Sequence, residues 1–248
     1  MIRKQIERGT IEFLKDILSK QSILFVKEVE DNPHRYFMFS LNRGDFVYHF
    51  SLRFYKPNFI KYNVNFSFSN NSISSLVQQI NPQTLENNEE WIMCNMNLND
   101  FLTESNKDSI LHGFKWVGDG SLEAYVDNLP ISKERLPIIA QEMYETFFKP
   151  VLFRIIPALN TLEKIDKILN NLPELKQNNS ELPLLTSLWH PHSHQLALGV
   201  ILANYLNRPD KLPITDKYLK LAEEYGEDDY GYIDLLHDAV KYFRSRKM

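Results

Sequence analysis

The sequence predicts an α+β fold, with an N-terminal helix and an antiparallel β-meander followed by a helical C-terminal half. Three observations support this fold class. Apolar residues near the N-terminus are spaced as on one helical face, those within residues 22–69 alternate with polar ones, and from residue 131 the helical spacing returns. Strands followed by helices are typical of a sheet that helices cover on one face.

The first predicted element is a helix that begins near residue 10. Its apolar face consists of Ile11, Phe13, Leu14, Ile17 and Leu18. Thr10 is a suitable N-cap, because its hydroxyl can accept a hydrogen bond from an otherwise unpaired amide of the first turn. Gly9 weakens any continuation upstream, so we expect the helix to start at Thr10.

Residues 22–69 show the two-residue period of strands with one wet and one dry face, which indicates an antiparallel sheet. The predicted strands are "ILFVKEVE", "HRYFMFSLN", "DFVYHFSLRFY" and "IKYNVNFSFS". Gly44 can adopt the positive φ that a hairpin turn between the second and third strands requires. The tripeptide Arg43-Gly44-Asp45 is therefore interpreted as a turn and not as a cell-adhesion motif.

The next segment predicts a short helix at "SISSLVQQI", a strand at "EEWIMCNMNL" and a hairpin at "FKWVGDGSLEAYV". In the helical half, Pro150 and Pro157 predict a kink or two short helices, because proline lacks the backbone donor. Asn160 and Glu163 resemble a capping box in front of "TLEKIDKIL". Further helices are expected at about residues 192–207, 215–225 and 231–246. We expect a β-rich half at residues 1–130 and a helical half at residues 131–248, or one continuous domain.

Composition excludes several classes of protein. The chain has 248 residues and a net charge of −4, so it offers no overall basic surface for nucleic acid. Cys94 is the single cysteine, which excludes an intrachain disulfide and a cysteine-rich zinc site. We find no secretory signal and no run of roughly 20 apolar residues, and therefore expect a cytoplasmic protein without membrane spans. No nucleotide-binding or hydrolase motif is present, so no cofactor is expected.

The segment "WHPHSHQLALGVILANYL" places His190, His192 and His194 at alternate positions. In an extended segment the three imidazoles would share one face and could bind zinc, as in a metal-dependent hydrolase. The competing interpretation is the N-terminus of a helix, because Pro191 and Ser193 suit a first turn and a cap. We favour the helix and keep the metal site as the alternative.

An acidic stretch forms the second candidate site. Residues 216–238 contain eight acids and two lysines, a local charge of −6, and tyrosines lie among the acids. The stretch is either a solvated loop or a surface that binds a protein partner, since clustered carboxylates attract a basic protein and tyrosines often anchor interfaces. The candidate partner-binding residues are Glu224, Glu227, Asp228, Asp229, Tyr230 and Tyr232. The acid spacing of an EF-hand is missing, which argues against calcium.

The N-terminal helix, the aromatic meander "YFMFSLNRGDFVYHFSLRFY" with "YNVNFSFS", and the helix "HQLALGVILANYL" with the amphipathic pair after it define a layout. This layout resembles uncharacterised bacterial domains, among them immunity proteins of polymorphic toxin systems. The resemblance implies a cytoplasmic, non-enzymatic protein that binds a cognate toxin and blocks it by occlusion. It implies no catalytic residues. A component of a larger assembly is a further possibility that the sequence does not separate from this one.

Overall fold

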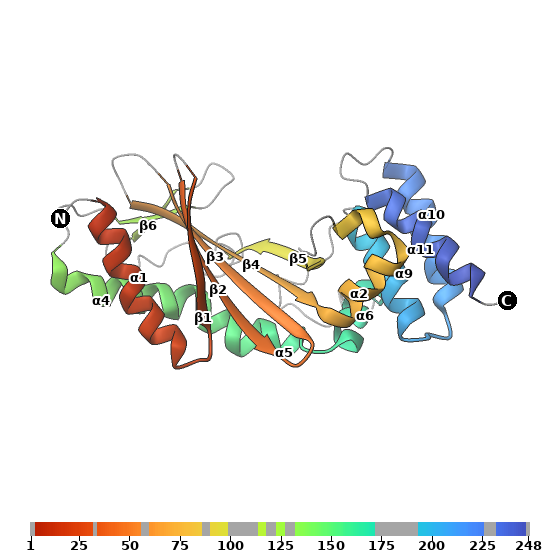
Figure 1. The fold of residues 1–248 in the computed structure, drawn as a ribbon, viewed down its shortest axis with the longest axis horizontal. Coiled ribbons are helices and arrows are strands. Elements are labelled where there is room, and N and C mark those ends of the chain that lie inside the picture. Colours follow the sequence, from red (N-terminus) through yellow and green to blue (C-terminus); the bar gives the residue numbers. More distant parts are fainter. Residues whose placement is uncertain are drawn as a thin grey trace. The chain divides into compact units, whose positions relative to one another are not determined.

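The computed structural model describes residues 3–31, 34–55, 60–85, 90–98, 114–117, 123–126, 132–171, 193–225 and 232–246 (Figure 1). Contacts within the chain divide it into two compact units. Unit 1 comprises Met1–Phe68 and Asn95–Ile155, and unit 2 comprises Ser69–Cys94 and Ile156–Met248. Each unit is built from two separate chain segments, and the change from strands to helices near residue 130 falls inside unit 1.

The predicted α+β class is confirmed, because helix α1 (Arg3–Ser19) precedes an antiparallel meander and helices follow it (Figure 1). The strands are β1 (Leu24–Asp31), β2 (His34–Arg43), β3 (Phe46–Tyr55), β4 (Ile60–Asn70), β5 (Ile92–Asn97), β6 (Phe114–Val117) and β7 (Glu123–Val126). They form a seven-stranded sheet in the order β1-β2-β3-β4-β7-β6, and β5 also pairs with β4. Gly44, with a φ of 59°, lies in the β2–β3 turn as predicted.

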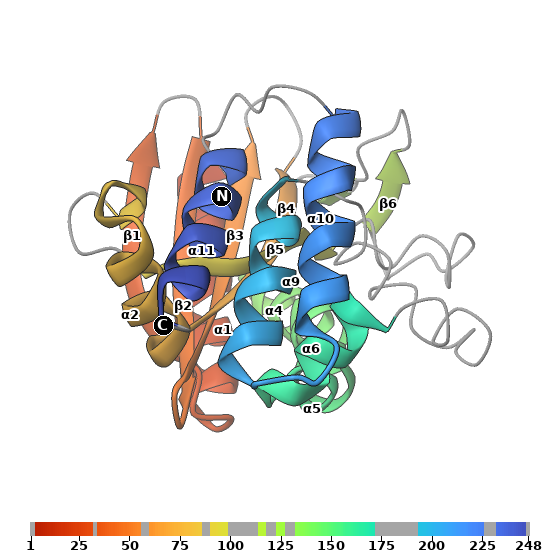
Figure 2. The ribbon, with the colours of Figure 1, turned by 90° about the vertical axis from the view of Figure 1, so that its right-hand side faces the viewer.

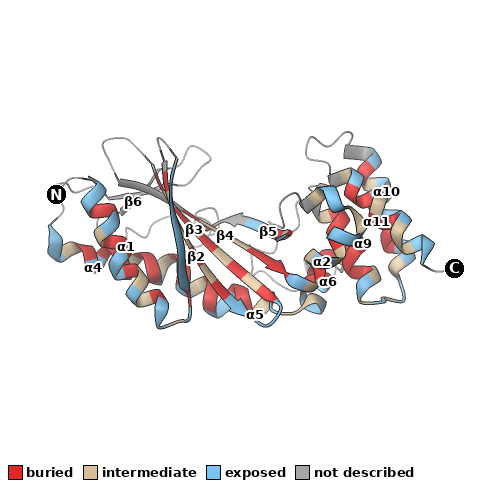
Figure 3. Ribbon diagram, viewed as in Figure 1, coloured by how far each residue is buried: buried red, intermediate tan, exposed pale blue. Residues whose placement is uncertain are grey.

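Buried residues recur along the central strands (Figure 3), and most of them are aromatic side chains that form a core on one face of the sheet. Its fully or nearly fully buried side chains in β2, β3 and β4 are Phe37, Phe39, Leu41, Phe46, Tyr48, Phe50, Leu52, Phe54, Val64, Phe66 and Phe68. The described side chains between them are only half-buried or exposed, which confirms the alternation predicted for these strands. Tyr48 stacks between Phe46 and Phe66, with ring centroids 5.9 Å and 6.1 Å away.

The hydroxyl of Tyr48 is buried and has no hydrogen-bond partner in the described part of the chain. Burial raises the pKa of Tyr48 to about 12, because the phenolate would lose its hydration. Tyr48 therefore behaves as one more large apolar member of the core.

Helix α1 begins at Arg3, so the predicted start at Thr10 is wrong. Thr10 lies within the helix and is buried. The reason is tertiary: a Cβ on Gly9 would lie 2.6 Å from Cδ1 of Leu136, so glycine permits a close approach of α1 to helix α4 (Leu136–Met143). Packing between these helices outweighs the low helix propensity of glycine.

The chain remains helical through Pro150 and Pro157, but the helix near these prolines is partly π-helical. After the 3₁₀ turn η2 (Lys133–Arg135) and α4, it forms two π-helical segments, η3 (Tyr144–Phe148) and η4 (Val151–Ile155), and then α5 (Ile156–Ala158). Each π segment lies within two residues of a proline, whose missing N–H removes an ordinary helical hydrogen bond. Phe148 of η3 covers the aromatic core, with ring centroids 5.1 Å from Phe50 and 6.1 Å from Phe39.

Unit 2 contains α2 (Asn71–Ile80), η1 (Pro82–Leu85), α6 (Leu162–Asn170), α9 (Ser193–Tyr205), α10 (Lys211–Tyr225) and α11 (Tyr232–Ser245). Helix α9 is its centre, since it packs against α6, α10 and α11 (Figure 2). Residues 196–203 are all buried, as expected of a helix that is apolar on every side. None of the helices in the described ranges combines the length and hydrophobicity needed to cross a membrane.

Two helix starts in unit 2 differ from expectation. The cap of α6 is Thr161, whose side chain accepts a hydrogen bond of 3.3 Å from the amide of Lys164, and not Asn160. Asn160 instead accepts a bond of 2.8 Å from the Lys164 ammonium. Helix α10 begins at Lys211, ahead of the predicted residue 215. Pro213 is tolerated in its first turn, because backbone amides there have no acceptor within the helix and the missing N–H of proline costs no hydrogen bond.

Candidate functional site

The acidic candidate surface falls largely outside the described residues. The backbone of Glu224 lies in the last turn of α10 and that of Tyr232 begins α11. Their side chains, and all of residues 227–230, lie outside the part of the chain that the structure describes. A partner-binding role for these residues therefore stays a prediction.

The histidine candidates fall outside it as well. His190 and His192 are not among the described residues, and only the backbone of His194 is described, in the first turn of α9. The predicted helix does begin at Ser193. Within the described ranges no three His, Cys, Asp or Glu side chains could together hold a metal ion. The histidine metal site thus stays the untested alternative to the favoured helix N-terminus, and the zinc content of the purified protein and of a His192→Ala variant would test it.

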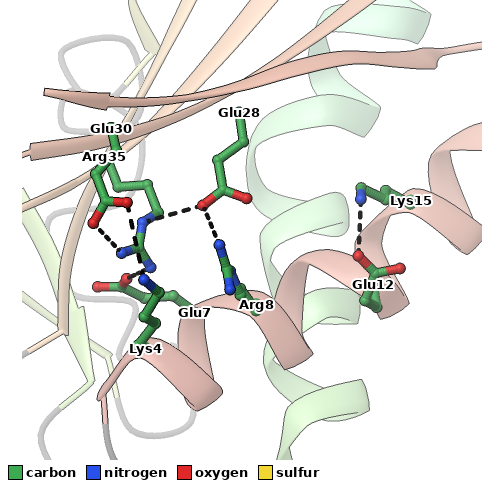
Figure 4. A network of polar contacts seen from close by, with 8 residues as sticks. All are labelled: Lys4, Glu7, Arg8, Glu12, Lys15, Glu28, Glu30 and Arg35. Carbon is green, nitrogen blue, oxygen red and sulfur yellow. Dashed lines mark hydrogen bonds and ion pairs between the residues drawn. The ribbon is translucent and has the colours of Figure 1, made fainter.

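The described residues instead bring together a set of charges where α1 meets β1 and β2 in unit 1 (Figure 4). Arg35 of β2 is buried, and its guanidinium contacts three carboxylates. The nitrogen–oxygen distances are 2.9 Å to Glu7, 3.3 Å to Glu28 and 2.8 Å to Glu30. Glu30 lies opposite Arg35 in the β1–β2 register, and Glu7 comes from the buried side of α1.

Two cations of α1 also form ion pairs with carboxylates of β1. Arg8 lies 3.2 Å from Glu28 and Lys4 lies 3.9 Å from Glu30. The hydrogen bond from Arg35, followed by its positive charge, holds the pKa of Glu30 below its ordinary value. These contacts fix α1 against the edge of the sheet, so the surface around them has a defined shape.

A hollow of about 600 Å³ lies beside this network, between α1 and the start of α4. Its lining residues are Lys4, Gln5, Arg8, Gly9, Phe13, Lys133 and Leu136. Three of these are cationic and none is acidic. Lys4 and Arg8 belong both to the hollow and to the network, so the hollow and β1 are parts of one surface.

Strand β1 carries exposed apolar side chains on both faces of the sheet edge. Phe25 pairs with buried Phe39 and lies on the α1 side, whereas Leu24 and Val29 pair with Ser40 and Tyr36 and lie on the other side. Leu24 is 61% exposed, Val26 52%, and Phe25 and Val29 36% each. We call these four residues along the edge strand the β1 patch. The patch, the network and the hollow, which extend around this edge of the sheet, are together called the α1–β1 face. Strand β1 is the last strand on its side of the sheet, and the register shifts between Phe25 and Lys27. Such a bulge hinders strand pairing, so this edge presents side chains more readily than backbone.

Phe25 is held in place from both sides. Its ring lies 5.6 Å from that of Phe39 in an edge-to-face arrangement, and the Lys15 ammonium lies 3.9 Å from its ring centroid. Glu12 in turn lies 2.8 Å from the same ammonium (Figure 4). The patch therefore contains a pre-ordered aromatic ring, which is the kind of anchor that protein interfaces use.

A second polar cluster, in unit 2, has a structural role. Arg208 contacts Asp166 at 2.7 Å, Asp210 at 2.7 Å and Asn171 at 2.8 Å, and so joins α6 to the turn between α9 and α10. Tyr218 of α10 donates a bond of 2.9 Å to the carbonyl of Leu169. Each charged group of the cluster faces a partner of opposite charge within the unit. Cys94 is buried too, which raises the pKa of its thiol, so a nucleophilic thiolate is disfavoured.

Sequence reasoning did not single out the α1–β1 face. The one available signal was Arg35, a charged residue at a position that shares the buried face of β2 with Phe37 and Phe39. No protein-family model, no curated protein and no solved structure matches the chain. The function must therefore be argued from the described surfaces themselves.

Proposed function

We propose that the chain is a non-enzymatic protein that acts by binding another protein, and that unit 1 contributes the α1–β1 face to this contact. The observation that carries the proposal is the β1 patch, with four large apolar side chains exposed on one strand. Single exposed apolar residues are common on monomers, but neighbouring ones mark interaction surfaces. The charges beside the patch would form the polar rim of such an interface.

The class of partner follows from the layout that resembles immunity proteins. On this proposal the partner is a toxin that the chain neutralises by occlusion in the cytoplasm. The predicted acidic residues 224–232 supply a second contact, which would attract a basic region of the toxin. Unit 2 holds 16 acidic and 11 basic residues, so its net charge supports this role.

The test uses the purified chain and the purified protein encoded beside it, mixed and examined by size-exclusion chromatography and calorimetry. Wild-type chain should form a stoichiometric complex. Val26→Lys and Leu24→Lys should weaken it by about tenfold or more, since a charge in the centre of an apolar contact is desolvated without a partner. Leu212→Lys is the matched control, because Leu212 is 54% exposed but lies on α10.

Charge reversal at Glu227, Asp228 and Asp229 tests the second contact separately. If this variant alone loses the complex, residues 224–232 bind the partner and the α1–β1 face does not. The proposal fails altogether if no complex forms, or if all of these variants bind as the wild type does.

A further inference from the structure

We propose that the hollow beside α1 binds an acidic segment of a protein partner, with a carboxylate among its cations and a neighbouring apolar side chain on its floor. This inference rests on the proposed function, because it assumes that the α1–β1 face meets a protein. It adds the chemistry of the segment that is recognised. The acidic residues 224–232 would instead attract a basic region of the partner. The two surfaces would therefore contact different segments of that partner.

The charges around the hollow favour an anion. Lys4, Arg8 and Lys133 line it, from α1 on one side and from η2 on the other. The side chains of Lys4 and Arg8 are 49% and 53% exposed, so they keep the freedom to turn toward a ligand. Cations on two separate elements can contact one carboxylate from both sides, which a single helix could not arrange.

The present ion pairs of Lys4 and Arg8 can be exchanged at little cost. Their partners Glu30 and Glu28 also contact Arg35, at 2.8 Å and 3.3 Å, and would keep that contact. Pairs between exposed side chains contribute roughly 0–1 kcal/mol, so an incoming carboxylate competes with a weak interaction. The network thus leaves two cations of α1 available to a partner without leaving a buried charge unpaired.

The floor of the hollow is apolar. Gly9 lacks a side chain, one methyl group of Leu136 lies against it, and Phe13 borders the hollow with 43% of its surface exposed. An exposed phenylalanine beside cations suits a ligand that is both acidic and apolar. Small-molecule sites commonly enclose 70–90% of their ligand. Most side chains that line this hollow are exposed, so it fits a projecting side chain of a protein segment better.

The experiment measures the fluorescence anisotropy of a labelled peptide in which glutamates flank one phenylalanine. Full-length chain should bind it, and added salt should weaken binding. A peptide with lysine for glutamate, and one with serine for phenylalanine, should bind at least about tenfold more weakly. The triple variant Lys4→Gln/Arg8→Gln/Lys133→Gln should lose about tenfold in affinity. Phe13→Ala should lose affinity for the phenylalanine peptide only.

The control variant is Lys217→Gln/Lys220→Gln/Lys241→Gln, which removes three exposed cations from unit 2 and so changes the net charge equally. It should bind the peptide as the wild type does, and thermal unfolding verifies that both triple variants are folded. The inference is overturned if the lysine peptide binds equally well or if the hollow variant binds normally. It is also overturned if decanoate displaces the peptide and binds more tightly, which would indicate a fatty acid as ligand. Because the assay contains no natural partner, its failure is distinguishable from failure of the complex tested with the β1 patch variants.

Discussion

The guanidinium of Arg35 donates a hydrogen bond of 2.9 Å to the carboxylate of Glu7, and both side chains are buried. The two residues are 28 positions apart, so the bond joins helix α1 to the sheet. Arg35→Met should lower the free energy of unfolding by roughly 3–5 kcal/mol, because it removes the guanidinium that pairs with the buried carboxylate of Glu7. Urea unfolding followed by circular dichroism measures this loss.

The double variant Arg35→Met/Glu7→Leu is the control for this prediction. It removes both charges and fills their volume with apolar atoms, and should recover most of the stability. A loss of less than about 1 kcal/mol in the single variant would contradict a buried, tightly coupled pair.

Gly199 of α9 lies directly against the ring of Tyr218. A Cβ at this position would be 2.4 Å from Cε2 of the ring, and the ring itself is fixed by the hydrogen bond from its hydroxyl to Leu169. Gly199→Ala should therefore destabilise the protein by about 1–3 kcal/mol, although alanine is the better helix former. Comparison with Gly9→Ala is informative, since there the close atom is a rotatable methyl group of Leu136 and the loss should be smaller. Equal melting temperatures for the two variants would contradict this account.

Tyr48 and Tyr218 are buried tyrosines with opposite hydrogen-bonding status. Tyr48→Phe should stabilise the protein by up to about 1 kcal/mol, because it removes a hydroxyl that has no partner in the described part of the chain. Tyr218→Phe should destabilise by about 1 kcal/mol, because the Leu169 carbonyl loses its donor. The two melting temperatures should shift in opposite directions, and a loss of stability in Tyr48→Phe would show that its hydroxyl is satisfied.

The lowered pKa of Glu30 predicts that the stability of the fold depends on pH. Its pKa in the folded chain lies below the ordinary value of 4.5, mainly because of the hydrogen bond from Arg35. A lowered pKa means that the stabilisation is complete above pH 4.5 and is lost as the pH falls through the folded-state pKa. Wild type should thus be more stable than Glu30→Gln at pH 7, and the difference should shrink toward zero in acid. Glu163→Gln, on the exposed surface of α6, controls for the loss of one surface charge. A difference that grows in acid would refute the assignment.

The elements could be predicted where their pattern is local. Alternation along β3 and β4 identified the buried faces that include Phe50 and Phe66, because successive strand residues point to opposite sides of a sheet. The start of α1 could not be predicted, because glycine has a low helix propensity and the sequence does not show that Leu136 packs closely against Gly9. The candidate acidic and histidine residues were read from composition and spacing alone, and they stay predictions.

The sequence by itself determined the α+β class, the strand faces, the β2–β3 turn at Gly44 and the approximate helices, because backbone geometry repeats every two or 3.6 residues. The tertiary structure alone decided which distant segments form each unit, where Arg35 finds Glu7, and that Lys4, Arg8 and Lys133 surround one hollow. These relationships depend on packing between residues far apart in the chain. No local period encodes them.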